Sequence, residues 1–260
     1  MVTCPTVLRG TEFLTRRLPD RADSLSCLLV TRLRVGPTRL KPPQRMGDRS
    51  AIRDRDGLAR EDGLVSTQRD RFLEHVQRNP INCALLEQAA QLDVPDWWLA
   101  SGSVFQTVWN VIDGRDPTAG IGDYDLIYFD DTDLSWDAED AVIRRAAELF
   151  VDIPALVEVR NEARVHLWYE QHFGVPAEPF TSTTDAVDNF ASTTCCFAVT
   201  QDSHGQLQVY APHGYDDLFA QRLRPNPRLA PREVYERKAA RWSKEWPGLI
   251  VDPWPHSRAQ

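Results

Sequence analysis

The sequence has no uninterrupted apolar run close to the about 20 residues that span a bilayer, so it predicts no transmembrane helix. It also has no C-x-x-C pair, and its cysteines number five, which argues against structural zinc and a disulfide framework. Cys195 and Cys196 are adjacent, and we expect both to be buried in a strand rather than to act as nucleophiles. These absences favour a reducing, cytoplasmic globular protein.

Positive charge is scarce over most of the chain but not at its start. The net charge is −8, which does not favour binding of free duplex DNA by bulk attraction. Residues 1–67 are the exception, since they hold 13 Lys and Arg against 8 Asp and Glu and show little periodicity. We expect residues 1–67 to be a disordered basic extension, with an RNA-gripping arm as the alternative, and residues 68–260 to form the folded domain.

Helical and strand patterns follow one another from residue 68 onward. Helices are expected over 69–78, after Pro80, and over 104–112, 138–149, 162–173 and 231–245. Strands are expected over 97–100, 123–129 and 156–160, followed by a hairpin of 194–200 and 206–211. These elements place the candidate site residues on strands and at the starts of helices.

Three acidic residues lie on two of the expected strands. Asp123 and Asp125 alternate at the start of an apolar run, so both side chains point to one face of the strand. Glu158 lies within the strand LVEVR, and the three carboxylates converge if the two strands are neighbours. Carboxylates that close raise one another's pKa, and a pair of divalent cations relieves the repulsion. Mg²⁺, or Mn²⁺ in its place, takes such oxygen ligands and leaves positions for substrate phosphates.

A glycine and a serine lie where one expected strand ends and a helix begins. Gly102 allows the backbone to approach a phosphate closely, and the start of the helix offers unpaired N–H donors. Ser103 adds a hydroxyl to this segment. One segment can therefore hold an anion, and the next can hold the metal ions that neutralise it.

Four further polar residues are candidates for substrate contacts. Asn161 and Arg164 follow the third carboxylate and could contact a phosphate or an acceptor, with capping and surface roles as the alternative. Lys238 and Arg241 lie one turn apart on the last expected helix. They are candidates to bind a triphosphate if that helix covers the cleft, and a solvated helix face is the alternative.

The order of these motifs resembles that of the DNA polymerase β-type nucleotidyltransferase superfamily. Its signature is a hydrophobic residue, then Gly-Gly or Gly-Ser, a helix, an acidic-x-acidic strand and a third acidic residue on a neighbouring strand. The chain is similar to a bacterial nucleotidyltransferase-like family in the segments SGSVFQTVWN, DYDLIYFDD, VEVRNEARVHLWYEQHFG, YAPHGYDDLF, RPNP and VYERKAARW, over about residues 68–252. The resemblance implies an α/β (α+β) fold, a polymerase β-like core with a small mixed, twisted sheet flanked by helices.

The resemblance also implies an activity. It suggests a metal-dependent enzyme that moves a nucleoside monophosphate from an NTP to an unknown hydroxyl acceptor, which is a small molecule, RNA or protein, and releases pyrophosphate. It assigns the nucleotide phosphates to Gly102 and Ser103, both metal ions to Asp123 and Asp125, and one metal and the acceptor proton to Glu158. The sequence departs from the pattern in two places. The spacing between Ser103 and Asp123 is 19 residues, longer than usual, and position 158 holds Glu where Asp is commoner.

Three other functions fit parts of the sequence. A nucleotide-sugar glycosyltransferase also uses a D-x-D motif and a divalent metal, although only two helices and one strand precede the motif here. A catalytically inactive relative would bind a nucleotide or a partner protein. An RNA-tail-binding module would use the basic residues 1–67.

Overall fold

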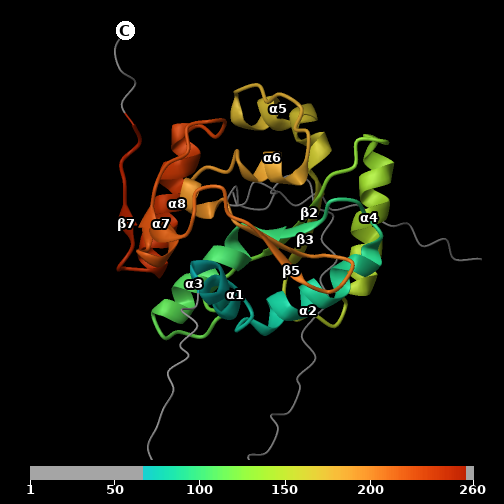
Figure 1. The fold of residues 1–260 in the computed structure, drawn as a ribbon. Helices are drawn as coiled ribbons and strands as arrows, with labels where there is room; N and C mark the ends of the chain where they lie inside the picture. The colour runs from blue at the N-terminus through green and yellow to red at the C-terminus, as the bar shows by residue number, and fades with distance from the viewer. Residues whose placement is uncertain (1–66, 256–260) are drawn as a thin grey trace, which may run out of the picture.

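A five-stranded mixed sheet forms the centre of the fold. The computed structural model describes residues 67–255, so the expected disordered extension, residues 1–67, lies outside the described residues except for Thr67. The strands are β1 (Trp98–Ala100), β2 (Tyr124–Tyr128), β3 (Val157–Asn161), β4 (Ala198–Gln201) and β5 (Leu207–Tyr210), in the order β3-β2-β1-β4-β5 (Figure 1). Only β2 and β3 are parallel within this sheet; the other neighbours are antiparallel. The predicted small mixed sheet is confirmed.

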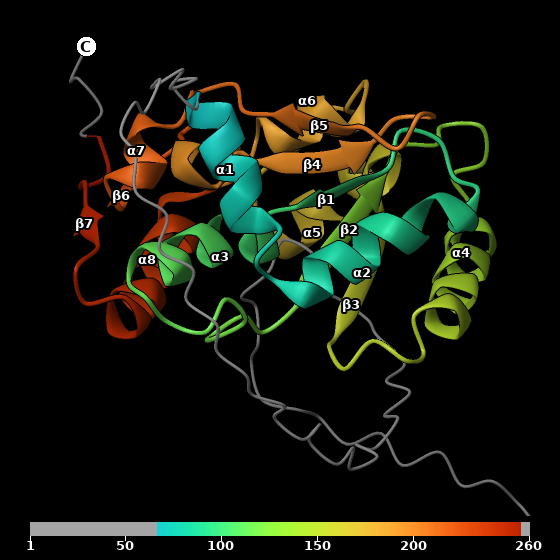
Figure 2. The same cartoon turned by 60° about the horizontal axis from the view of Figure 1, so that its bottom comes forward.

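Helices cover both faces and the ends of this sheet. Figure 2 shows α1 (Gln68–Val76) and α2 (Pro80–Gln88) in front of the sheet and α5 (Tyr169–Phe173) behind it. The other helices are η1 (Ala89–Leu92), α3 (Gly102–Ile112), α4 (Trp136–Leu149), η2 (Glu162–Leu167), α6 (Thr183–Val187), η3 (Thr193–Cys195), α7 (Asp216–Phe219) and α8 (Arg232–Glu245). A separate parallel pair joins β6 (Arg222–Leu223) to β7 (Ile250–Val251). No helix within residues 67–255 is long and apolar enough to cross a membrane.

The first two helices begin at residues that satisfy the free N–H groups of a helix start. The Thr67 hydroxyl accepts a hydrogen bond from the Asp70 N–H, and the Asp70 carboxylate accepts one from the Thr67 N–H, which forms a capping box. The Asn79 side chain accepts from two N–H groups of α2, and Pro80 occupies the first helical position. These local signals are why both helices begin within a residue or two of their predicted starts.

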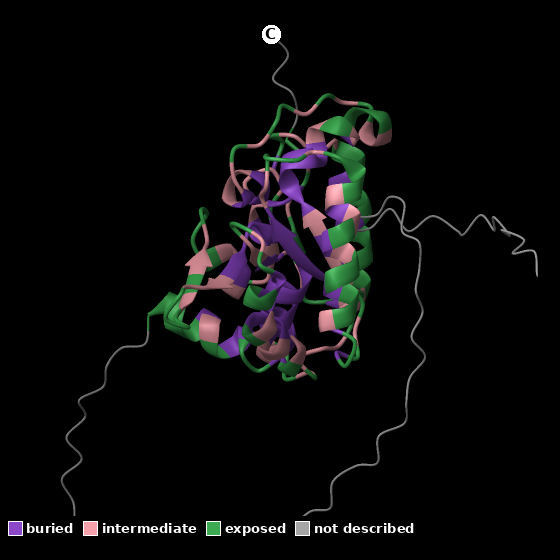
Figure 3. Ribbon diagram, turned by 90° about the vertical axis from the view of Figure 1, so that its right-hand side faces the viewer, coloured by how far each residue is buried: buried purple, intermediate pink, exposed green. Residues whose placement is uncertain are grey.

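The two faces of the sheet pack against different partners. Leu126 and Tyr128 of β2 belong to the main core, which also contains Phe72 of α1 and Leu85 of α2. Ile127 points the other way and packs in a smaller apolar cluster with Val187 of α6 and with Phe190, which follows α6. Figure 3 shows the buried residues concentrated along the sheet and on the inner sides of the helices. Because side chains alternate along a strand, Asp125 shares the α6 face with Ile127.

An aromatic cluster fixes α8 against α3. Trp109 of α3 packs edge-on against Trp242 and Trp246, with ring centroids 6.3 and 5.5 Å away. The Trp246 indole N–H donates to the Asn110 side-chain oxygen at 3.0 Å. Trp109 is fully buried, which confirms the expectation that it is a core residue. The cluster determines how α8 lies relative to the start of α3, where the candidate site begins.

The structure corrects the expected helix over 162–173. This stretch forms the 3-10 helix η2 and then the short helix α5, and the two are separated by Trp168, whose φ is −129°. Val165, Trp168 and Tyr169 are β-branched or aromatic residues, which lose side-chain freedom in an α-helix. The hairpin is confirmed as β4 and β5, but its first strand begins at Ala198 because residues Thr193–Cys195 form η3.

Candidate active site

One row of paired residues crosses the sheet from β3 to β4. Asp125 is the register partner of Glu158 in β3 and of Ala100 in β1. Ala100 is in turn paired with Ala198 of β4. Paired residues on neighbouring strands present their side chains to the same face. The carboxylates of Asp125 and Glu158 are therefore neighbours on the α6 face, as expected if the two strands adjoin.

Asp123 belongs to the same acidic region. It lies two residues before Asp125, and both carboxylates act electrostatically on the ammonium of Lys238. Asp125 is 5% exposed, whereas Asp123 and Glu158 are half-buried. Within residues 67–255, no three His, Cys, Asp or Glu side chains are gathered into a ready-made metal-binding group. The register thus pairs two carboxylates directly, and a metal ion bound to them would need further ligands from a substrate.

The start of α3 lies beside this acidic region. Ser101 has φ 59° and ψ −133°, a backbone conformation that residues other than glycine rarely adopt. Gly102 and Ser103 begin the helix, where backbone N–H groups have no partner within the helix itself. The Ser103 hydroxyl donates to the Ala100 carbonyl at 3.4 Å, and Ser103 is fully buried. What this segment offers to an anion is therefore its backbone N–H groups rather than the hydroxyl expected from the sequence.

Gln106 is a residue of this region that the sequence analysis did not select. A Cβ atom at position 102 would lie 2.8 Å from the Gln106 amide nitrogen, so the side chain of Gln106 covers Gly102. Gln106 is buried, with 5% of its surface exposed. The sequence did contain a signal for Gln106. It lies four residues after Gly102, so the two residues are on the same side of a helix.

Helix α8 brings Lys238 to the acidic region. Lys238 is 7% exposed, and burial lowers the pKa of its ammonium group, while Cys195 and the two aspartates oppose that shift. Its nitrogen lies 5.6 Å from the centre of the Trp242 ring. Arg241 is exposed and lies over the same ring at 5.6 Å. Lys238 is therefore buried rather than on a solvated helix face, whereas Arg241 is exposed on the same helix.

The two adjacent cysteines are buried, as expected. Burial raises the pKa of Cys195 to about 12, and burial also raises the pKa of Cys196. Both side chains are thiols near neutral pH, so neither is an activated nucleophile. Cys195 lies in η3 rather than in a strand, which corrects that part of the expectation.

Asn161 and Arg164 have structural roles that the sequence did not distinguish from substrate contacts. The Arg164 guanidinium forms a buried ion pair with Glu139 of α4 and donates to the Leu134 carbonyl at 3.0 Å. The Asn161 amide donates to the Asp130 carbonyl at 2.7 Å, and its oxygen accepts from the Ala163 N–H. These contacts tie the end of β3 to α4 and to the loop after β2, which is a structural role such as the capping alternative expected from the sequence.

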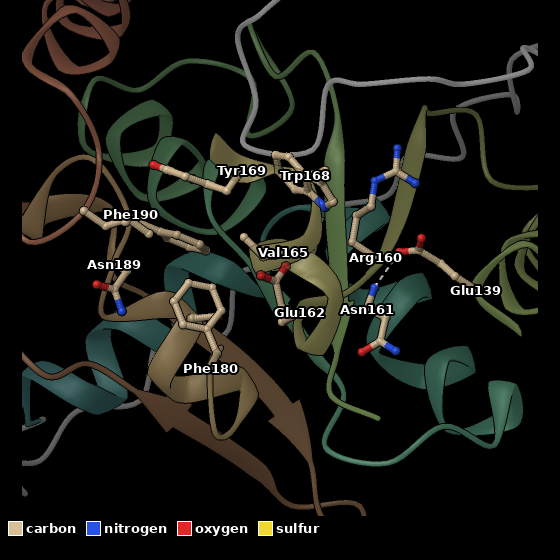
Figure 4. Close-up of a pocket in the computed structure, with 12 residues that line it drawn as sticks. Glu139, Arg160, Asn161, Glu162, Val165, Trp168, Tyr169, Phe180, Asn189 and Phe190 are labelled. Carbon is tan, nitrogen blue, oxygen red and sulfur yellow. Dashed lines mark hydrogen bonds between the residues drawn. The ribbon is translucent and has the colours of Figure 1, made fainter. Parts of the chain in front are cut away.

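Glu162 is a fourth carboxylate near the acidic region, at the start of η2 directly after β3. It is 9% exposed and lines a pocket between β3, η2, α5 and α6 (Figure 4). Burial raises the pKa of Glu162 to about 7, and the nearby Arg160 opposes this shift. The folded protein therefore holds a proton on Glu162 at pH values where the unfolded chain, with an ordinary value of 4.5, has lost it.

This shift predicts a pH-dependent stability difference between the wild type and Glu162→Gln. Because each pKa unit corresponds to about 1.4 kcal/mol, the wild type should lose about 3 kcal/mol of stability as pH rises from 4, below the unfolded-state pKa, to 8. Glu162→Gln has no such cost, so its free energy of unfolding should match the wild type near pH 4 and exceed it at pH 8. Urea unfolding at both pH values measures this. Glu170→Gln, at an exposed position of α5, is the control, and equal curves for all three proteins would contradict the prediction.

Comparison with known structures supports the architecture. An NMR structure described as revealing a CCA-adding enzyme head domain matches with a TM-score of 0.59 and 24% sequence identity. The match covers 74% of this chain and 98% of the other chain, and it shows a shared fold. No curated protein matches the sequence.

A family model described as nucleotidyltransferase matches residues 87–251. The matched range holds the whole five-stranded sheet, the start of α3, the three carboxylates and most of the described chain. The resemblance found in the sequence, to polymerase β-type nucleotidyltransferases, is thereby confirmed. The chain belongs to this nucleotidyltransferase family.

Proposed function

We propose that this protein is a metal-dependent nucleotidyltransferase that transfers a nucleoside monophosphate from an NTP to a hydroxyl group of an acceptor and releases pyrophosphate. The observation that carries the proposal is the pairing of Asp125 with Glu158 next to the start of α3. Membership of the family supports nucleotidyl transfer as the reaction class. The acceptor is a small molecule, RNA or protein, and a cytoplasmic location stays a prediction.

We assign the binding of two Mg²⁺ ions, or of Mn²⁺ in their place, to Asp123, Asp125 and Glu158. Carboxylate oxygens are the hard ligands that Mg²⁺ prefers, and Mg²⁺ is usually held by one or two carboxylates together with substrate phosphates. Two adjacent carboxylates therefore fit such an ion without a closed set of protein ligands. When bound, the ions would offset the negative charge on the attacking and leaving oxygens.

The remaining residues would bind and orient the substrates. The backbone N–H groups at Gly102 and Ser103 would hold nucleotide phosphates, because they point out of the start of a helix. Lys238 and Arg241 would contribute positive charge toward the triphosphate from α8. Glu158 would accept the proton of the acceptor hydroxyl. In this scheme the protein contributes mainly position and charge, which suits a phosphoryl transfer.

The test is a labelling screen with the full chain. Each of the four NTPs, labelled at the α-phosphate, is incubated with cell extract and Mg²⁺ or Mn²⁺, and mass analysis identifies what has gained a nucleotide. We expect transfer with release of pyrophosphate that stops on addition of EDTA. Transfer from a labelled UDP-sugar instead would identify a glycosyltransferase. Binding of NTP with no product in any extract would support the inactive relative.

A further inference from the structure

A small pocket adjoins the acidic region on the same side of the sheet. It is lined by Arg160 of β3, by Glu162 and Val165 of η2, and by the aromatic residues Trp168, Tyr169, Phe180 and Phe190. Its volume is about 30 Å³, which is room for one or two water molecules. Only a group of about that size can enter this pocket without moving its walls.

Glu162 is one of two carboxylates that line this pocket, and the other, Glu139, is paired with Arg164. Figure 4 shows the Glu162 carboxylate between Val165 and Phe180 and facing Phe190, while the Arg160 guanidinium extends away from it. Within residues 67–255, no hydrogen bond or ion pair is recorded for this carboxylate, although the residue is nine-tenths buried. A buried carboxylate among apolar and aromatic side chains is unfavourable unless a cation or a donor pairs with it. A small cation bound in the pocket would stabilise the ionised form of this carboxylate.

We propose that this pocket binds a primary ammonium group of the acceptor, with Glu162 as its counter-ion and the rings of Phe180 and Phe190 beside it. A primary ammonium is close to a water molecule in size, so it fits the volume, whereas a guanidinium or a nucleobase does not. The carboxylate supplies the opposite charge, and the aromatic walls favour a cation over an anion. This inference rests on the proposed function, because it names the acceptor class of that reaction.

The chain length between the two glutamates limits the length of the acceptor. Glu158 lies in β3 and Glu162 begins η2 four residues later, so their Cα atoms are at most about 14 Å apart. Arg160, which by alternation shares the face of Glu158 and Asp125, also lines the pocket. A hydroxyl at Glu158 and an ammonium at Glu162 would thus belong to one amino alcohol whose two ends are separated by no more than about that distance.

The first test measures binding without any reaction. Amino-octanol, with an amine at one end and a hydroxyl at the other, and its neutral analogue octanediol are titrated into the full chain at pH 8 and followed by NMR. We expect amino-octanol to bind the wild type at least about 10-fold more tightly than octanediol does, and Glu162→Gln to abolish that difference. Glu170→Gln, which removes a carboxylate from the exposed side of α5, should behave as the wild type. Equal binding of both compounds, or unchanged binding by Glu162→Gln, would overturn the proposal.

The second test separates this proposal from the proposed function. Transfer of a labelled nucleotide to amino-octanol and to octanediol is measured with Mg²⁺ and the four NTPs. Preferential transfer to amino-octanol that Glu162→Gln removes would support both proposals. Amine-dependent binding without transfer would leave the ammonium pocket in place and count against the transferase. Equal transfer to both compounds would support the transferase and overturn the ammonium pocket.

Discussion

Asp125→Asn is expected to reduce nucleotidyl transfer by about 10³-fold while the protein stays folded. Asp125 is the residue paired both with Glu158 and with Ala100, so it lies between the second carboxylate and the start of α3. Asparagine keeps the size of the side chain but removes one negative charge where the proposed reaction needs a cation. The rate is measured as pyrophosphate release with the NTP and acceptor found in the labelling screen.

Asp131→Asn is the matched control for this experiment. Asp131 is exposed in the loop that follows β2, so its substitution removes the same charge without touching the paired carboxylates. Its activity should stay within about two-fold of the wild type, because surface charges contribute little. Thermal unfolding should show that both variants are folded. If Asp125→Asn kept most of the activity, the assignment of the acidic region as the catalytic centre would be wrong.

Arg164→Ala is expected to lower the free energy of unfolding by about 3–5 kcal/mol. The variant leaves the Glu139 carboxylate buried without its cation, since Arg164 is the partner that forms the ion pair. Glu139 also accepts a hydrogen bond from the Asn161 N–H at 3.0 Å, shown dashed in Figure 4, so the loss reaches the end of β3. Urea unfolding at neutral pH measures the change.

Two further variants test whether the unpaired charge is the cause. Replacing Glu139 and Arg164 together by leucine removes both charges and should recover a large part of the stability, because apolar residues can replace a buried ion pair at little cost. Arg144→Ala breaks an exposed pair with Asp140 on the same helix, and its effect should stay below about 1 kcal/mol. An Arg164→Ala loss no larger than that of Arg144→Ala would show that the buried pair is not important for stability.

Local patterns in the sequence predicted much of the fold. Thr67, Asn79 and Pro80 mark helix starts through contacts within a few residues, and the structure begins α1 and α2 there. The alternation in β2 put Asp123 and Asp125 on one face of one strand. Helix starts and strand alternation depend only on residues that are near neighbours along the chain, so both can be predicted from the sequence.

Other features depend on contacts that the sequence does not contain. Arg164 was a candidate for substrate contact until α4 placed Glu139 against it, 25 positions earlier in the chain. Ser103 was expected to offer its hydroxyl, but its place after β1 turns that group to the Ala100 carbonyl. Glu162 was part of an expected helix, and only the packing of α5 and α6 around it made it a buried carboxylate.

By itself the sequence determined the three acidic residues of the motif, the strand that carries Asp123 and Asp125, and the glycine at the start of α3. Each of these follows from the spacing of residues that are near neighbours in the chain. The tertiary structure alone decided that β3 lies parallel to β2 in the register that pairs Glu158 with Asp125, and that α8 brings Lys238 to them. Strand pairing and helix packing join residues far apart in the chain, and they are selected by the fit of whole surfaces. The short-range periodicity of a sequence does not specify how those surfaces fit together.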